Sequence, residues 1–325
     1  MTYIPELHLF EPEGERIAFV PLAGGVRDGS GGRIVALGTF DGLHIGHAAI
    51  LRETLRLAAE TGLEPAVFCV LCPPDCSVGG KGGSSLSSEA DTLAGFASFG
   101  IRAAYLSALP DLCGVTAEEF IRDVLIGRLG AAGVVCGFNF TFGRGRAGTF
   151  GMLREAFGDL AVRLPAVTVG GEPVSSSRIR ALIADGRVED VLPLLGRYYS
   201  VCLPVVSGRR DGRKLGFPTA NQRVPHAHTL PPQGVYVTVS HTDDGRAWPS
   251  VTDVGTAPTL DQSRVPRLET HLLDAPEGID LYGRFLTVEF RKRLRGELRF
   301  PDAAALAAQI ARDVADVRQY FAEEK

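Results

Sequence analysis

The chain lacks a run of about 18 uncharged apolar residues, so the sequence predicts no membrane-spanning helix. Its first residues include several acids and no apolar core, which argues against a signal peptide and favours the cytoplasm. It also lacks a basic excess: the formal net charge is −4, and residues 198–325 are nearly balanced. Neither half is suited to neutralising a phosphate backbone, so we expect no nucleic-acid or membrane partner.

Disulfides and a cysteine metal centre are not expected either. Three of the six cysteines, Cys69, Cys72 and Cys76, form a C-x2-C-x3-C cluster that matches no standard zinc finger. An iron–sulfur cluster is the alternative, but Cys69 lies within an apolar run, where buried thiols are common. Cytosolic thiols stay reduced, so we predict unligated thiols.

Short apolar runs alternate with amphipathic stretches between residues 33 and 170, which predicts a doubly wound α/β domain with a parallel sheet. The expected strands are Ile34–Leu37, Ala66–Leu71, Ala103–Leu106, Val134–Cys136 and Ala161–Val167. The expected helices are His47–Glu60, Ser88–Phe99, Thr116–Leu129 and Thr149–Phe157, the third opening on a capping box.

The pattern changes after Gly170-Gly171. Two short helices, Ser175–Ala184 and Val188–Leu195, precede about a hundred residues that favour a small antiparallel β-barrel. Its expected strands are Tyr199–Val206, Val235–Ser240, Pro249–Val254, Leu268–Leu273 and Leu286–Arg291, and a helix over Pro301–Phe321 closes the chain. We place the domain boundary at residues 186/187, giving domains 1–186 and 187–325.

The clearest chemical signature is GTFDGLHIGH, residues 38–47, between a buried strand and a helix. Its glycines, Gly38 and Gly46 among them, let the backbone approach a ligand, and a helix N-terminus favours anions. His44 and His47 are able to donate hydrogen bonds to phosphate oxygens, whereas a zinc site lacks a nearby third ligand. The segment therefore predicts a site for a nucleoside triphosphate.

Two further segments accompany this signature. VSSSRIR, residues 174–180, begins a helix where hydroxyls, amides and Arg178 are suited to a triphosphate, although a run of serines alone is more often a helix cap. GFNFTFGRGRAG, residues 137–148, is a glycine-rich aromatic loop after a strand.

Together these segments resemble the nucleotidyltransferase superfamily, and in their spacing the prokaryotic bifunctional riboflavin kinase/FMN adenylyltransferase family. The resemblance covers about residues 34–321 and implies that the FMN phosphate attacks the α-phosphorus of Mg-ATP and expels pyrophosphate. It implies catalytic roles for His44, His47 and Arg178. It implies nucleotide binding by Gly38, Thr39, Phe40, Asp41, Gly46, Ser176 and Ser177, and flavin binding by Asn139, Phe140 and Phe142.

The second constellation is GRRDGRKLGFPTAN, residues 208–221. No Walker A sequence is present, so a phosphate loop must be of another kind; alone, the basic stretch is typical of a solvated turn. Thr219 and Asn221 offer oxygens suited to Mg2+. With GFPTAN, LPPQGVYV, VGTAPT, LETHLLD, LYG and LRGELRF, the segment resembles the riboflavin kinases of the same family.

That resemblance implies an antiparallel barrel in which Glu269 takes the proton from the ribityl 5′-hydroxyl as the γ-phosphoryl group transfers. Arg295 is implied in flavin binding, although a surface role is the more common one for an arginine. Nucleotide binding is implied for Gly208, Gly212, Lys214, Gly216, Pro218 and Thr219, and metal binding for Thr219 and Asn221.

We therefore expect a nucleotidyltransferase domain followed by a riboflavin kinase domain, which use ATP and Mg2+ to make FMN and then FAD. LCPPD (residues 71–75), Asn139 and Ala48 depart from the family pattern. They keep open a riboflavin kinase whose first domain is inactive or re-specialised. A flavin-binding protein without activity is the remaining alternative, and the sequence does not indicate an oligomeric state.

Overall fold

The computed structural model describes residues 18–21, 32–72, 84–208, 211–225, 227–258, 264–276 and 278–324. By contacts, the chain divides into two compact units. The first comprises Met1–Gly83 and Glu89–Val174, and the second comprises Ser84–Ser88 and Ser175–Lys325. Among the described helices, none combines the length and the apolar composition that crossing a bilayer requires.

The first unit is built on one six-stranded sheet. β1 pairs with β4 in the antiparallel sense, and the other neighbouring strands are parallel, as the sequence predicts. In spatial order the strands are β1 (Ala18–Pro21), β4 (Ala103–Ala108), β3 (Glu64–Leu71), β2 (Arg33–Gly38), β5 (Ala131–Gly137) and β6 (Ala161–Leu164).

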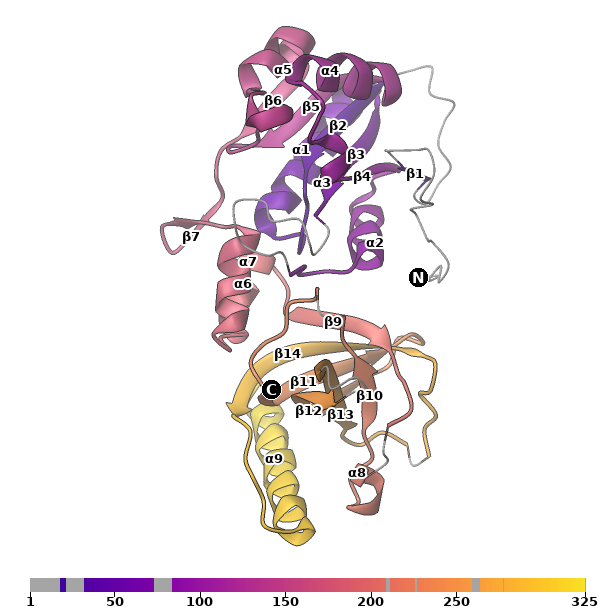
Figure 1. Ribbon diagram of the computed structural model, residues 1–325, viewed down its shortest axis with the longest axis vertical. Helices are drawn as coiled ribbons and strands as arrows, with labels where there is room; N and C mark the ends of the chain where they lie inside the picture. Colours follow the sequence, from indigo (N-terminus) through magenta and orange to yellow (C-terminus); the bar gives the residue numbers. More distant parts are fainter. Residues whose placement is uncertain are drawn as a thin grey trace. The chain divides into compact units, whose positions relative to one another are not determined.

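Helices cover both faces of this sheet (Figure 1). Alternate residues of β2 enter different cores, because successive side chains of a strand point to opposite faces. Ile34 and Ala36 pack with α1 (Ile45–Thr61) and α2 (Glu89–Phe99). Val35 and Leu37 pack with the helices of the other face, namely α4 (Ala117–Glu119), its π-helical continuation η1 (Phe120–Arg128) and α5 (Phe150–Phe157). The doubly wound prediction is therefore confirmed.

The capping box predicted for the third helix is present. The amide of Glu119 donates to the hydroxyl of Thr116 (3.2 Å), and the amide of Thr116 donates to the carboxylate of Glu119 (2.9 Å). Three single turns, α3 (Leu109–Leu112), η2 (Arg144–Arg146) and η3 (Gly158–Leu160), connect the longer elements.

The region after β6 differs from its prediction. The strand expected to reach Val167 ends at Leu164, because Pro165 has no amide hydrogen to donate to a neighbouring strand. A small hairpin of β7 (Thr168–Val169) and β8 (Glu172–Pro173) follows, and then α6 (Ser176–Ala184). The next expected helix is present as a 3₁₀ turn, η4 (Glu189–Val191), followed directly by an α-helical turn, α7 (Leu192–Leu195).

The second unit is a curled antiparallel sheet, as predicted. Across the sheet its strands are β10 (Ala220–Arg223), β13 (Arg264–Leu272), β12 (Ala247–Pro258), β11 (Gly234–Thr242), β14 (Phe285–Arg295) and β9 (Tyr199–Pro204). β10 begins at the end of the GFPTAN segment and was not predicted, because Ala-Asn-Gln-Arg carries no apolar alternation.

Hydrogen bonds join the two edges of this sheet. The amide of Val206, just past β9, donates to the carbonyl of Asn221 on β10 (2.8 Å). Gln222 is fully buried, and its Nε2 donates to the carbonyls of Leu203 on β9 (2.8 Å) and Leu286 on β14 (2.7 Å). These bonds close the sheet into a small barrel.

The last helix, α9 (Ala303–Glu323), covers part of the barrel's outer face (Figure 1). Val317 packs there against Val235 and Val237 of β11 and Val251 of β12. The helix begins at the cap residue Asp302, whose carboxylate accepts from the amide of Ala305 (2.7 Å). The predicted terminal helix is thus confirmed, with its apolar face on the barrel.

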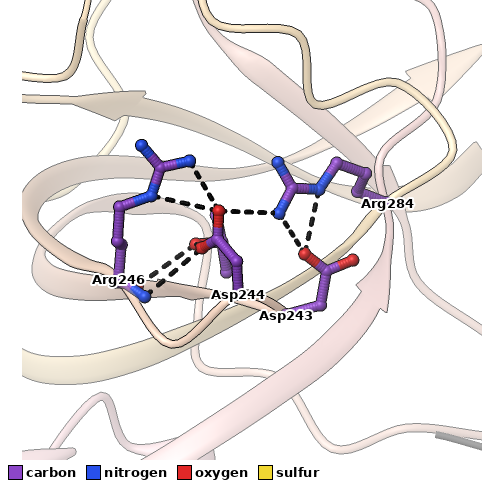
Figure 2. Close-up of polar contacts among 5 residues, drawn as sticks. Asp243, Asp244, Arg246 and Arg284 are labelled. Carbon is purple, nitrogen blue, oxygen red and sulfur yellow. Dashed lines mark hydrogen bonds and ion pairs between the residues drawn. The ribbon is translucent and has the colours of Figure 1, made fainter. Parts of the chain in front are cut away.

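Two further contacts hold surface segments of this unit. The turn between β11 and β12 carries Asp243, Asp244 and Arg246, which Figure 2 shows linked with Arg284 in one exposed ion-pair network. Residues 84–88 precede α2 in the chain, yet the amide of Ser85 donates to the carbonyl of Ala227.

Candidate functional site

The GTFDGLHIGH segment forms a tight turn between β2 and α1. Phe40, Gly42 and Leu43 all have φ in the left-handed region, at 50°, 78° and 42°. Residues other than glycine seldom adopt this backbone conformation, and such strain persists only where surrounding contacts impose it. Strained turns of this kind concentrate at functional sites.

Packing against α2 holds the strained turn in place. The buried ring of Phe40 meets Phe96 edge-on, with 5.2 Å between ring centroids. Leu43 lies against Gly95, where a Cβ would come within 2.1 Å of the leucine Cδ1. Gly95 is therefore required for the close approach of α2, and no sequence signal marks it as part of this region.

His44 and His47 stack at the start of α1, with 3.7 Å between ring centroids. The amide of His47 donates to Nδ1 of His44 (3.2 Å), so His44 caps the helix and its Nε2 carries the proton of the neutral ring. Gly46 permits this arrangement, because a Cβ there would lie 3.0 Å from the His44 ring. Burial, and then the neighbouring His44, lower the pKa of His47 well below its ordinary value. His47 is therefore a neutral group at pH 7.

The edge of this turn contacts strand β3. The buried thiol of Cys69 donates to the carbonyl of Thr39 (3.3 Å), and burial raises the pKa of this thiol. The side chain of Thr39 is exposed and that of Asp41 is half-buried. Of the LCPPD departure, residues 73–75 lie outside the described residues.

The aromatic loop after β5 places its three predicted flavin residues differently. Asn139 is exposed, Phe140 is half-buried and Phe142 is buried. Phe142 packs between Phe140 and Phe120, with centroid distances of 5.8 and 5.3 Å. Phe142 thus belongs to the core that supports the loop. Of the three predicted flavin residues, only Asn139 and Phe140 are accessible.

The SSSRIR segment forms the first turn of α6. Ser175 is the cap residue, and its hydroxyl accepts from the amide of Arg178 (3.2 Å). Ser176 and Ser177 follow in the first turn, half-buried and exposed respectively. By contacts this helix belongs to the second unit, whereas GTFDGLHIGH belongs to the first.

The glycines of the second constellation allow its loop to pack on β10. A Cβ at Gly208 would lie 2.7 Å from the Asn221 side chain, and one at Gly212 would lie 2.4 Å from the carbonyl of Phe217. Gly216 has φ +86°, which a side chain would strain. Lys214 ends the short helix α8 (Asp211–Lys214), and its side chain lies outside the described atoms.

Thr219, Asn221 and Glu269 come together at the β10–β13 pair. Asn221 lies directly opposite Glu269, and its Nδ2 donates to the carbonyl and the hydroxyl of Thr219 (3.3 and 3.4 Å). Arg267, two residues before Glu269 on the same face, contacts the Glu269 carboxylate at 2.8 Å. Residues from two strands and one loop thus present a base beside neutral oxygen ligands.

His271 supports this cluster, a role that the sequence did not predict. Its Nδ1–H donates to the carbonyl of Pro218 (2.8 Å), and its ring meets Phe217 edge-on at 5.6 Å. The side chain of Pro218 is exposed. The contact holds the GFPTAN loop against β13, and membership of LETHLLD was the available signal.

Arg295, predicted to contact flavin, is bound to α9. Its Nε and Nη2 donate to both carboxylate oxygens of the buried Asp313 (3.0 and 2.7 Å), and its Nη1 donates to the carbonyl of Gly296. Gln309 completes the arrangement by donating to Asp313 (2.9 Å). The guanidinium therefore joins the end of β14 to the terminal helix.

Comparison with known proteins assigns both halves. A family model described as FAD synthetase matches residues 27–178, and one described as riboflavin kinase matches residues 195–321. Bifunctional riboflavin kinase/FMN adenylyltransferases are similar over nearly the whole chain. That of Escherichia coli K12 is 33% identical, covering 89% of this chain and 93% of its own, and that of Pseudomonas fluorescens is 34% identical, covering 88% and 92%.

A solved structure shares the whole architecture. A crystal structure described as a macrolide-efflux protein from Streptococcus pneumoniae superposes with a TM-score of 0.77 at 27% identity, covering 89% of this chain and 94% of its own. The efflux description concerns that protein alone. From both domain matches and the full-length relatives, the chain belongs to the bifunctional riboflavin kinase/FMN adenylyltransferase family.

Proposed function

We propose that this chain phosphorylates riboflavin to FMN with ATP and then adenylylates FMN to FAD with release of pyrophosphate. The observation that carries the proposal is the pairing of Asn221 with Glu269 beside Thr219, in a chain that also holds the strained His44–His47 turn. Because both reactions consume ATP, we also propose that the protein works in the cytoplasm.

In the phosphorylation, Glu269 takes the proton of the ribityl 5′-hydroxyl while the hydroxyl oxygen attacks the γ-phosphorus and ADP leaves. One Glu269 oxygen contacts Arg267, which fixes the orientation of the carboxylate and leaves the other oxygen for the proton. Gly208 and Gly212 lie beside Asn221 and Thr219, on the β10 side of this base, and we assign the glycine-rich segment to which they belong to the phosphates of ATP.

Thr219 and Asn221 would hold Mg2+. Their side chains lie within hydrogen-bonding distance of each other and supply a hydroxyl and an amide oxygen, which suit this hard cation. Bound there, the ion would neutralise charge on the transferring phosphoryl group. Among the described residues no group of three or more His, Cys, Asp or Glu forms an alternative metal site.

In the adenylylation, an FMN phosphate oxygen attacks the α-phosphorus of ATP and pyrophosphate leaves, so no covalent intermediate with the protein is required. His44 Nε2–H and the neutral His47 serve as hydrogen-bond donors to the phosphates rather than as acids. Arg178 and the first turn of α6 serve the same triphosphate, and Asn139 and Phe140 contact the flavin.

The test separates the two reactions in the full-length protein. Glu269→Gln should lower FMN formation from riboflavin at least about a hundredfold, because a general base is removed. The same variant should adenylylate supplied FMN at the wild-type rate. Chromatography of the flavins, after incubation with Mg-ATP and either riboflavin or FMN, measures both products.

His44→Asn is the matched variant for the first unit. Asparagine retains an oxygen that caps α1 but lacks the Nε2–H donor, so adenylylation should fall about a hundredfold while phosphorylation is unchanged. FMN from riboflavin without FAD from either substrate, in the wild-type chain, would instead support a kinase with a re-specialised first domain.

A further inference from the structure

A carboxylate that the mechanism above does not use lies beside the proposed base. Asp253 of β12 is the direct cross-strand partner of Glu269 of β13. Facing side chains at such positions have Cβ atoms about 5 Å apart. Asn221, Glu269 and Asp253 therefore form one row across β10, β13 and β12, with Glu269 in the middle.

The groups that we assign to ATP and Mg2+ lie at one end of this row. The Thr219 hydroxyl, Asn221 and the adjoining Gly208 all lie on the β10 side of Glu269. Phosphoryl transfer places the attacking and leaving oxygens roughly in line across the phosphorus. If ATP occupies the β10 side, the alcohol and the remainder of its molecule must extend from Glu269 over β12, where Asp253 lies.

Asp253 is an open acceptor in that position. Within the described ranges no donor hydrogen-bonds its half-buried carboxylate. Burial, and then the charge of Glu269, raise the pKa of Asp253 to about 6, while Arg267 acts in the opposite sense. At pH 7 the group is therefore mainly a carboxylate without a protein hydrogen-bond donor, so it is able to accept a hydrogen bond from a ligand hydroxyl.

The neighbouring residue on the same face, Gly255, lies against the Asp253 carboxylate. A Cβ at Gly255 would lie only 3.2 Å from Oδ2 of Asp253, so a side chain there would crowd this oxygen. The same point is 3.8 Å from Nε of Arg267 and 3.8 Å from Oε1 of Glu297. Three carboxylates, those of Asp253, Glu269 and Glu297, outnumber the guanidinium groups of Arg267 and Arg295 around it, so the surface suits a hydroxyl donor better than an anionic ligand.

We propose that Asp253 determines specificity for the ribityl chain by accepting a hydrogen bond from one of its secondary hydroxyls. The inference rests on the proposed riboflavin kinase activity and extends it to the acceptor alcohol: a hydroxylated chain is selected over one that lacks that hydroxyl. Asp253 is thus a substrate-contacting residue on the flavin side of Glu269.

The test combines two variants with deoxyriboflavins that lack single ribityl hydroxyls. Asp253→Val removes the acceptor, so KM for riboflavin should rise between about tenfold and a hundredfold with KM for ATP unchanged. Asp253→Asn keeps one acceptor oxygen and should recover part of the loss. Asp274→Asn, which alters an exposed acid paired with Arg318, is the control and should leave KM unchanged.

The deoxyriboflavins supply the decisive comparison. The wild-type enzyme should lose a similar factor in kcat/KM with one particular deoxyriboflavin, and Asp253→Val should lose little more with that compound, because both changes remove the same bond. An unchanged riboflavin KM in Asp253→Val, or equal further losses with every deoxyriboflavin, would overturn the inference. No FMN formation by the wild-type chain would instead overturn the proposed kinase activity itself.

Discussion

The raised pKa of Asp253 links its proposed role in substrate binding to the stability of the fold. Its pKa is about 6 in the folded chain against an ordinary 3.8, so the folded state holds a proton more tightly than the unfolded state. The folded state therefore gains stability as pH falls through 6 towards 4, and carries a penalty when Asp253 is ionised at higher pH. Two pKa units correspond to at most about 3 kcal/mol.

Asp253→Asn should consequently raise the free energy of unfolding at pH 8, while it weakens riboflavin binding. The gain should shrink as pH is lowered through 6 and disappear near pH 4, because the wild-type residue is then also neutral. Thermal unfolding of both full-length proteins at pH 8, 6 and 4 measures it. A gain that is the same at all three values would show that the carboxylate's charge is not the cause.

The residues that the sequence revealed and those it missed differ in a physical way. His44, His47, Thr219, Asn221 and Glu269 belong to contiguous segments whose spacing is itself a signal. Asp253 belongs to no such segment, and it joins the site only through the β12–β13 register. Gly95 is similar, because its role depends on Leu43 from another element.

At the scale of elements, apolar periodicity located the long strands and helices, and elements held by polar contacts were missed. β10 is the clearest example, since Gln222 rather than an apolar side chain fills the barrel between β9 and β14. β6 also ends earlier than predicted, at Leu164. The apolar sequence continues beyond it, but Pro165 has no amide hydrogen to donate to a neighbouring strand.

Gln222→Leu should therefore weaken the closure between the edge strands β9 and β10 that makes the sheet a barrel. The substitution keeps an apolar volume but leaves the buried carbonyls of Leu203 and Leu286 without this donor, which should cost about 2–4 kcal/mol in unfolding free energy. A lowered unfolding midpoint of the full-length chain, with FMN formation reduced in parallel, is the expected result.

The exposed network of Figure 2 provides the control for that substitution. Asp244 also joins separate parts of the barrel, because it pairs with Arg284 as well as with its neighbour Arg246, but these side chains are partly or fully open to solvent, which screens ion pairs. Asp244→Ala should leave the unfolding midpoint unchanged within error. If both variants behaved alike, burial of the Gln222 bonds would not be what closes the barrel.

At the scale of the whole molecule, α6 is where the two activities meet in sequence. The FAD synthetase model ends at residue 178 and the riboflavin kinase model begins at 195, so the predicted boundary at 186/187 lies between them. Contacts instead assign Ser175 onward to the second unit. The boundary thus remains a prediction. α6 belongs by contacts to the second unit, while its first residues, 176–178, fall within the FAD synthetase match.

Substitution of Arg178 tests which of the two reactions α6 serves. Arg178→Ala keeps the backbone amide that donates to the Ser175 hydroxyl in the helix cap, and it removes a charge that we assign to the ATP of adenylylation. FAD formation from supplied FMN should fall about a hundredfold, and FMN formation from riboflavin should not change. Arg187→Ala, beyond α6 and paired with Asp190 at the surface, should affect neither reaction. A loss of phosphorylation alone in Arg178→Ala would place α6 functionally with the barrel, as its contacts do.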